Sequence, residues 1–203
     1  MASCLNMPNL KFRGFLRTAV FLPCVTSLVA YSVLFKSMFS YDGLINSILL
    51  KTGLVSESVP WLSDPFWAKV VVIAAITWRW TGYNMIFYLA AMQNIDKSIY
   101  EAARIDGISA TRRFLSITVP MLKPVILFTT VTSTIGTLQL FDEPMNITQG
   151  LISDVTLTLS LYIFKLSFRY VPNFGYAATV SYVIVVLVAI LAFIQFYLAR
   201  ERD

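Results

Sequence analysis

The side chains of this 203-residue chain that could do chemistry are suited to recognition, not to catalysis. The sequence has no histidine and two cysteines, so it lacks the usual general base and the usual nitrogen and sulfur ligands of a metal ion. A membrane-embedded enzyme would need a nucleophile–base pair or a metal cluster. The sequence therefore predicts a protein that is not an enzyme, with no catalytic residue and no metal site.

The first group of polar residues lies within a long apolar stretch and contains Arg79, Trp80 and Tyr83. A charged side chain near the middle of a bilayer costs about 2.5–3.5 kcal/mol on insertion scales. Arg79 should therefore face a bundle interior or a water-filled path, or else extend toward the outer surface. The two aromatic rings and the neighbouring Asn84 suit a sugar, although they suit ordinary helix packing almost as well.

The second group follows a later apolar stretch. Thr130, Ser133 and Thr137 have the spacing i, i+3, i+7, which places them on one face of a helix. Small hydroxyl residues on such a face join helices in membranes, and the alternative is that they line a pathway. Polar side chains continue past this stripe, and a polar helix end is tolerated in a membrane only against protein or a cavity. These residues are Gln139, Asp142 and Glu143.

The third group is the charged stretch YEAARIDGIS, residues 100–109. The sequence predicts a helix over 100–105 with Glu101 in its first turn, where the helix dipole favours an acid. Gly107 follows where a left-handed residue ends a helix, and Ser109 is placed to cap a second helix, from Ala110 to about Thr118. Pro120 is predicted to end that second helix.

The elements that must position these groups are four apolar stretches: 14–36, 68–92, 124–146 and 177–198. Each approaches or exceeds the roughly 20 residues that a spanning helix requires. The chain is 57% hydrophobic and 13% charged, against about 25% charged in soluble domains. We therefore predict an all-α polytopic membrane protein with four transmembrane helices, formed by residues 14–199. A cytoplasmic segment (1–13), a helix–turn–helix elbow (93–123) and a cytoplasmic tail (200–203) complete the predicted organisation.

Basic residues set the predicted orientation, and they do not indicate nucleic-acid binding. With both termini in the cytoplasm, the outer segments hold five basic residues: Lys36, Lys51, Lys69, Lys165 and Arg169. The inner segments then hold ten: Lys11, Arg13, Arg17, Lys97, Arg104, Arg112, Arg113, Lys123, Arg200 and Arg202. The positive-inside rule thus places the elbow in the cytoplasm.

The elbow also carries an ordered motif, in which Glu101-Ala102-Ala103 and Gly107 are followed by Ile117, Val119 and Pro120. This motif resembles the signature loop of importer permeases of the ATP-binding-cassette superfamily, whose usual ending is Ile-x-Leu-Pro. Stretches that resemble the maltose-type and multiple-sugar-type branch cover nearly the whole chain. They are residues 12–27, YDGLIN, WLSDP, GYNMIFYLAAMQ, LFDEPMNIT and NFGYAATVSY.

The resemblance implies a permease subunit of a carbohydrate importer in the bacterial plasma membrane, surrounded by lipid. Its partners would be a second permease subunit, a cytoplasmic ATPase dimer and an extracytoplasmic sugar-binding protein. ATP would bind to the ATPase, so this chain would need no cofactor. The elbow would couple the two through Glu101 as polar anchor, Ala102 and Ala103 as close-contact face, and Asp106 and Gly107 at the turn.

The resemblance also implies where the sugar passes. The motif places Trp80, Tyr83, Ser133, Thr137 and Gln139 beside it. Arg79 and Asp142 are predicted to form a gating or structural pair.

Three departures from the family's pattern open alternatives. Asp96 stands where proline is usual, and Gly150-Leu151-Ile152 stand where Gly-Gly-Pro is usual. The chain also lacks the family's first two spans, which favours a truncated product or fragment. The alternatives are therefore a non-transporting remnant of such a permease, or an importer of glycerol phosphate or a sugar alcohol.

Overall fold

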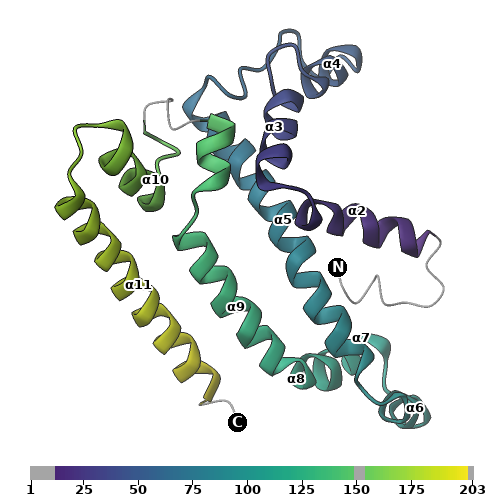
Figure 1. Ribbon diagram of the computed structural model, residues 1–203. Helices are drawn as coiled ribbons and strands as arrows, with labels where there is room; N and C mark the ends of the chain where they lie inside the picture. The colour runs from purple at the N-terminus through teal and green to yellow at the C-terminus, as the bar shows by residue number, and fades with distance from the viewer. Residues whose placement is uncertain (1–11, 149–153, 201–203) are drawn as a thin grey trace.

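The structure is a computed structural model that describes residues 12–148 and 154–200, and in these ranges every regular element is a helix. A long central helix, α5 (Pro65–Gln93), crosses the molecule, with α9 (Lys123–Leu138) beside it and α11 (Phe174–Arg200) beyond α9 (Figure 1). α2 (Arg13–Val25) and α3 (Leu28–Met38) lie on the other side of α5. Shorter helices complete the fold: α4 (Leu44–Lys51), α6 (Lys97–Ile105), α7 (Ala110–Arg113), η1 (Phe114–Thr118), α8 (Val119–Met121), η2 (Pro144–Thr148), α10 (Leu159–Phe164) and η3 (Lys165–Arg169).

Two of the four predicted spans are single helices. The stretches 68–92 and 177–198 correspond to α5 and α11, which extend three residues or fewer beyond the predicted bounds. Within the described residues α11 alone is both long and apolar enough to cross a membrane, and up to three spans result if each sharply bent helix pair counts as one. At 29 residues α5 is about 43 Å long, enough to span, although its polar middle makes it less apolar.

The prediction of one continuous helix over 14–36 is wrong. α2 and α3 meet at an angle of 110°, and Ser27 between them has extended backbone angles. Pro23 lies inside α2, where it removes a backbone donor near the break. The bend turns α2 across the lower part of α5, while α3 continues along its upper part (Figure 1).

The predicted span 124–146 also ends early, because α9 stops at Leu138. The chain then leaves helical geometry and re-enters it at η2, which packs against α3. Ile147 of η2 is buried in one core cluster with Tyr31 and Val71. The polar residues 139–143 thus lie in the gap between two helices. The predicted departures Gly150 to Ile152 fall outside the described residues.

Close crossings of the helices require glycine at two positions. An added Cβ at Gly82 of α5 would lie 2.2 Å from the carbonyl oxygen of Val20 on α2. At Gly136 of α9 it would lie 2.2 Å from the indole ring of Trp80 on α5. Small residues let membrane helices approach in this way. These two contacts fix the spacing of α2, α5 and α9.

The elbow, residues 93–123, begins with α6. Asp96 is its N-cap and accepts a hydrogen bond of 2.9 Å from the backbone N–H of Ser98. The helix therefore starts at Lys97, three residues before the predicted start, and Glu101 lies in its second turn and not its first. Gly107 has φ +70°, which confirms the left-handed residue predicted after the helix. Its N–H and that of Ile108 close the helix with bonds of 3.1 and 3.0 Å to the carbonyls of Arg104 and Ala103.

The second arm of the elbow is longer than predicted. Ser109 caps α7 as predicted, accepting a bond of 3.4 Å from the Arg112 backbone. Helical structure then continues through η1 and α8 to Met121, so Pro120 does not end it. η1 is a π-helix, a wider turn that accommodates the missing N–H of Pro120. The chain bends by 68° at Leu122 instead, where α9 begins.

Acid is expected to loosen the start of α6. The bond from the Ser98 backbone lowers the pKa of the Asp96 carboxyl below its ordinary value near ~4. Because the folded pKa is the lower one, this stabilisation is present above about pH 4 and is lost as the pH falls through the folded pKa. Hydrogen exchange of the first-turn amides, corrected for intrinsic rates, should show lower protection in α6 at acid pH. The hydroxyl-capped α7 is the internal control, and an unchanged α6 would contradict the prediction.

Candidate functional site

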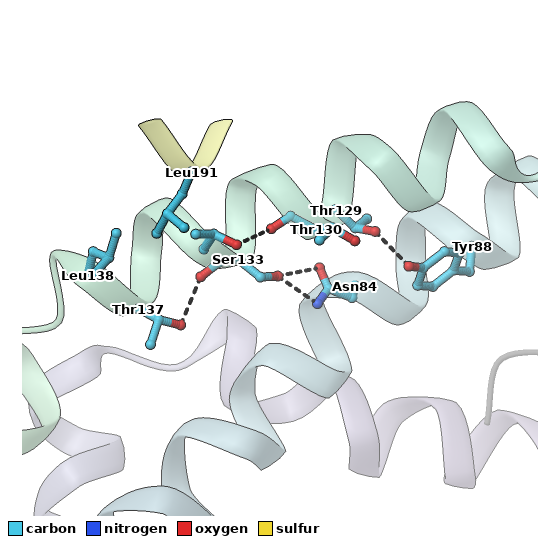
Figure 2. Close-up of a pocket in the computed structure, with 9 residues that line it drawn as sticks. Asn84, Tyr88, Thr129, Thr130, Ser133, Thr137, Leu138 and Leu191 are labelled. Carbon is cyan, nitrogen blue, oxygen red and sulfur yellow. Dashed lines mark hydrogen bonds between the residues drawn. The ribbon is translucent and has the colours of Figure 1, made fainter. Parts of the chain in front are cut away.

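A polar cavity of about 500 Å³ lies where α5, α9 and α11 face one another. Figure 2 shows its hydroxyl and amide groups along α9 and the facing side of α5, with Leu191 reaching in from α11. None of the described residues that line it is charged. The lining consists of Asn84, Tyr88, Thr129, Thr130, Ser133, Thr134, Thr137, Leu138 and Leu191.

Hydrogen bonds across this cavity join the three helices. The Asn84 amide nitrogen donates to the Ser133 hydroxyl oxygen at 3.0 Å, and the hydroxyls of Tyr88 and Thr129 lie 2.6 Å apart (Figure 2). On the other side, Gln195 of α11 donates to Thr134 at 2.8 Å. The predicted role of small hydroxyl residues in joining helices and their predicted role in lining a pathway therefore coincide here.

The remaining hydroxyls of α9 are turned onto its own backbone. Thr130 and Thr137 donate to the carbonyls of Ile126 and Ser133, four residues earlier, at 2.7 and 2.8 Å. Each hydroxyl oxygen keeps its acceptor lone pairs while its proton is engaged. Both residues are exposed to the cavity side. The wall thus offers acceptors, one exchangeable amide–hydroxyl pair and methyl groups, a set that matches neutral hydroxylated ligands.

A second, smaller cavity of about 330 Å³ is lined by Cys24, Arg79, Trp80 and Tyr83. The rings of Trp80 and Tyr83 meet edge to face with centroids 5.4 Å apart. The Trp80 indole nitrogen is buried and has no hydrogen-bond partner in the structure. Cys24 donates its thiol proton to the backbone carbonyl of Arg79 at 3.2 Å, which ties α2 to α5 beside the cavity.

Arg79 forms an ion pair with Glu143, the residue that precedes η2. Glu143 is 1% exposed and the Arg79 side chain 26% exposed. The predicted pairing of Arg79 with Asp142 is therefore wrong by one residue. The backbone of Asp142 accepts a bond from Asn146 instead. The break after α9 rotates the chain so that Glu143 faces the bundle, which residue spacing in a continuous helix could not indicate.

The structure thus divides the predicted pathway residues between two cavities. Ser133 and Thr137 line the first, whereas Arg79, Trp80 and Tyr83 line the second. Gln139 is the C-cap of α9, is exposed and lines neither of these two. Sequence reasoning missed three residues of the first cavity, and the signal for one of them was available because it follows Asn84 by one helical turn. The missed residues are Tyr88, Thr129 and Thr134.

The elbow residues differ in exposure. Glu101, Ala102, Asp106 and Gly107 are exposed, whereas Ala103 is 4% exposed and packs within this chain. Of the two alanines only Ala102 can offer a close-contact surface to a partner. The exposed face instead includes a side chain that the motif did not single out: Ile105, at 87% exposed. A hydrogen bond of 2.9 Å between the Tyr100 and Thr118 hydroxyls holds the two arms together.

An all-helical bundle of this kind, with an uncharged polar cavity between long apolar helices, defines an integral membrane protein of the permease class. The sequence matches the family described as binding-protein-dependent transport system inner membrane component over residues 1–203, and the chain belongs to this family. It is therefore a membrane component of ABC-type import systems, in a family that is not enzymatic.

Relatives and solved structures agree with this assignment. The chain is 67% identical over 204 residues to the lactose transport system permease protein LacF of Rhizobium radiobacter, covering all of this chain and 68% of that protein. It is 34% identical over 195 residues to the trehalose/maltose transport system permease protein MalF of Thermococcus litoralis, covering 96% and 64%. The chain spans about two thirds of the length of these relatives.

Among solved structures, a bacterial ABC transporter involved in the import of the acidic polysaccharide alginate matches with a TM-score of 0.88 and 25% identity. The match covers 98% of this chain and 70% of that one. A second crystal structure, of the bacterial alginate transporter in complex with an alginate pentasaccharide-bound periplasmic protein, matches with a TM-score of 0.79 over 98% and 68%.

Proposed function

We propose that the chain is a permease subunit of an ATP-driven importer for a neutral disaccharide or short oligosaccharide, with lactose as the first candidate. The observation that carries this proposal is the cavity between α5, α9 and α11, whose described lining residues are polar and uncharged. An anionic substrate such as glycerol phosphate would leave its charge without a partner there. Arg79 does not supply one, because Glu143 already neutralises it.

In this proposal the importer consists of this subunit, a second permease subunit, a cytoplasmic ATPase dimer and an extracytoplasmic sugar-binding protein. Sugar would pass through the cavity, and Arg79, Trp80 and Tyr83 would form an adjoining part of the path. The proposed orientation places both termini of the chain and the elbow in the cytoplasm, as basic residues favour. The bounds 14–199 for the membrane domain belong to the same proposal.

The elbow is proposed to transmit closure of the ATPase to the bundle. Support comes from its build: α6 is capped at Asp96, closed at Gly107 and tied to η1 through Tyr100, so it can move as one body. Glu101 and Ala102 stand on its exposed surface. A rigid body joined to a spanning helix can shift a two-state bundle between its arrangements.

Lactose uptake by a chimera tests the proposed function. The residues of Rhizobium radiobacter LacF that match this chain are replaced by the chain itself, and uptake of radiolabelled lactose is measured in cells that lack native LacF. The proposal expects uptake that depends on ATP and on the lactose-binding protein. A chimera that reaches the membrane in normal amounts yet takes up neither lactose nor another neutral oligosaccharide would overturn it.

Filling the cavity should impair this uptake. In the same chimera, Thr137→Leu removes an acceptor and adds bulk on the cavity wall, so we expect the KM for sugar to rise about tenfold, the effect of roughly 1.4 kcal/mol. Thr132→Val is the matched control, because Thr132 lies on the same helix and bonds its own backbone but does not line the cavity. Equal KM values in the two variants would exclude Thr137 from the substrate path.

Reversing the charge of the elbow should uncouple the importer. Glu101→Arg is expected to abolish uptake by the chimera while the subunit remains in the membrane, because a like charge would face the surface that accepts the carboxylate. Arg104→Gln, on the same exposed helix, is expected to retain most of the uptake. Co-purification of the ATPase separates the causes: Glu101→Arg should release it. ATPase retention with normal uptake would exclude Glu101 as an anchor.

A further inference from the structure

A third cavity, of about 540 Å³, lies at the end of the bundle that carries the elbow, between the start of α9 and the end of α11. Figure 1 places the last turn of α11 at the same end of the molecule as α8. Two of the residues that line the cavity are cations, Lys123 and Arg200, and the described lining includes no acid. The other lining residues are Pro120, Pro124, Leu127, Phe196 and Ala199.

We propose that this cavity binds the headgroup of an anionic phospholipid of the inner leaflet. Two cations at one mouth of a cavity between spanning helices, with apolar walls behind them, match a phosphate followed by acyl chains. The apolar side is open to the bilayer, since Phe196 is 56% exposed and Met121 next to the bend is 46% exposed. The family assignment puts the chain in a membrane, and the site is otherwise independent of which sugar is carried.

Depth supports a lipid as the occupant. α11 has 27 residues and is therefore about 40 Å long, which exceeds the roughly 30 Å hydrocarbon core. Arg200 in its last turn thus reaches the headgroup region, where it also complements the negative end of that helix. Lys123, the first residue of α9, stands at the opposite wall of the cavity at the positive end of its own helix. A phosphate between them is attracted from both walls.

The site spans the 68° bend between α8 and α9, because Pro120 lies before the bend and Pro124 after it. A lipid in the cavity would therefore contact the elbow arm and the spanning helix at once. Its headgroup would hold the bend at one angle.

Fluorescence quenching tests the site directly in the full chain. Phe196→Trp places a reporter in the cavity wall, and its signal is taken as the difference from the parent protein, which has four tryptophans. The protein is reconstituted in phosphatidylcholine vesicles that contain a minority of phosphatidylglycerol, with bromine on one lipid or on the other. We expect brominated phosphatidylglycerol to quench the reporter in excess of its share of the lipid, by about fivefold for each cation. Val185→Trp, exposed on the same helix, should follow the bulk composition.

Variants then assign the preference to the two cations. Lys123→Gln with Arg200→Gln should remove it, whereas Arg112→Gln with Arg113→Gln, which removes the same charge outside the cavity, should leave it intact. Arg200→Lys keeps the charge and should keep the preference, which guards against a folding defect. Inorganic phosphate in excess should not displace the lipid. Equal quenching by both lipids, an unchanged preference in the double variant, or displacement by phosphate would overturn the proposal.

Discussion

Glu143→Gln is expected to destabilise the folded chain more than any other single change of one atom group. Glu143 is almost completely buried and pairs with Arg79, so the amide would leave a buried guanidinium without its counter-charge. Removing one partner of a buried ion pair costs about 3–5 kcal/mol. Since Glu143 directly precedes η2, the loss should also release η2 from α3. Thermal stability in detergent, followed by the monodisperse fraction after heating, should fall sharply, and lactose uptake by the chimera with it.

Two further variants separate the charge effect from a packing effect. Asp142→Asn changes the adjacent carboxylate, which makes no ion pair with Arg79, and should alter stability by less than about 0.5 kcal/mol. Arg79→Met combined with Glu143→Met replaces both charges by apolar groups and should recover most of the stability lost in Glu143→Gln. If the double variant is no more stable than Glu143→Gln, the ion pair is not what holds η2.

Gly82→Ala should produce the second largest effect. The added Cβ would lie 2.2 Å from the carbonyl oxygen of Val20, and this neighbour is backbone, which cannot rotate away. α2 would have to move from α5, at a cost of about 1–3 kcal/mol or more. The same movement would disturb the bond from Cys24 to the Arg79 carbonyl. We expect a clear loss of thermal stability and of folded protein in the membrane.

Other glycines provide graded controls for this change. Gly175→Ala adds a Cβ whose nearest neighbour is 3.9 Å away, so it should be neutral or slightly stabilising in a helix. Gly136→Ala meets the side chain of Trp80, which can turn, and should fall between the two. A Gly82→Ala protein as stable as Gly175→Ala would show that α2 does not pack on α5 as closely as described.

Several features of the fold were predictable because local chemistry decides them. α5 and α11 follow from apolar length, and the end of α6 follows from Gly107, whose left-handed angle costs little without a side chain. The start of α7 follows from the capping hydroxyl of Ser109. Family membership followed from the ordered spacing within the elbow. The bends at residues 26–27 and 122, in contrast, depend on what lies beside them, and the first was not predicted at all.

The candidate site was predictable as a set of residues but not as a place. Stripe spacing predicted that Ser133 and Thr137 share a face, and they do. No spacing predicted that Asn84 would bond Ser133, or that Arg79 would lie in another cavity. The ion-pair partner was misassigned by one residue, because helical periodicity fails where α9 ends at Leu138.

By itself the sequence determined the composition of the spans, the caps of the elbow and the family, since each depends on residues that are near one another along the chain. Only the tertiary structure decided which polar groups meet. Contacts between Asn84 and Ser133, Arg79 and Glu143, and Gly82 and Val20 join residues 49 or more positions apart. Such pairs are set by the crossing of whole helices, and one bend or one early helix end changes all of them together.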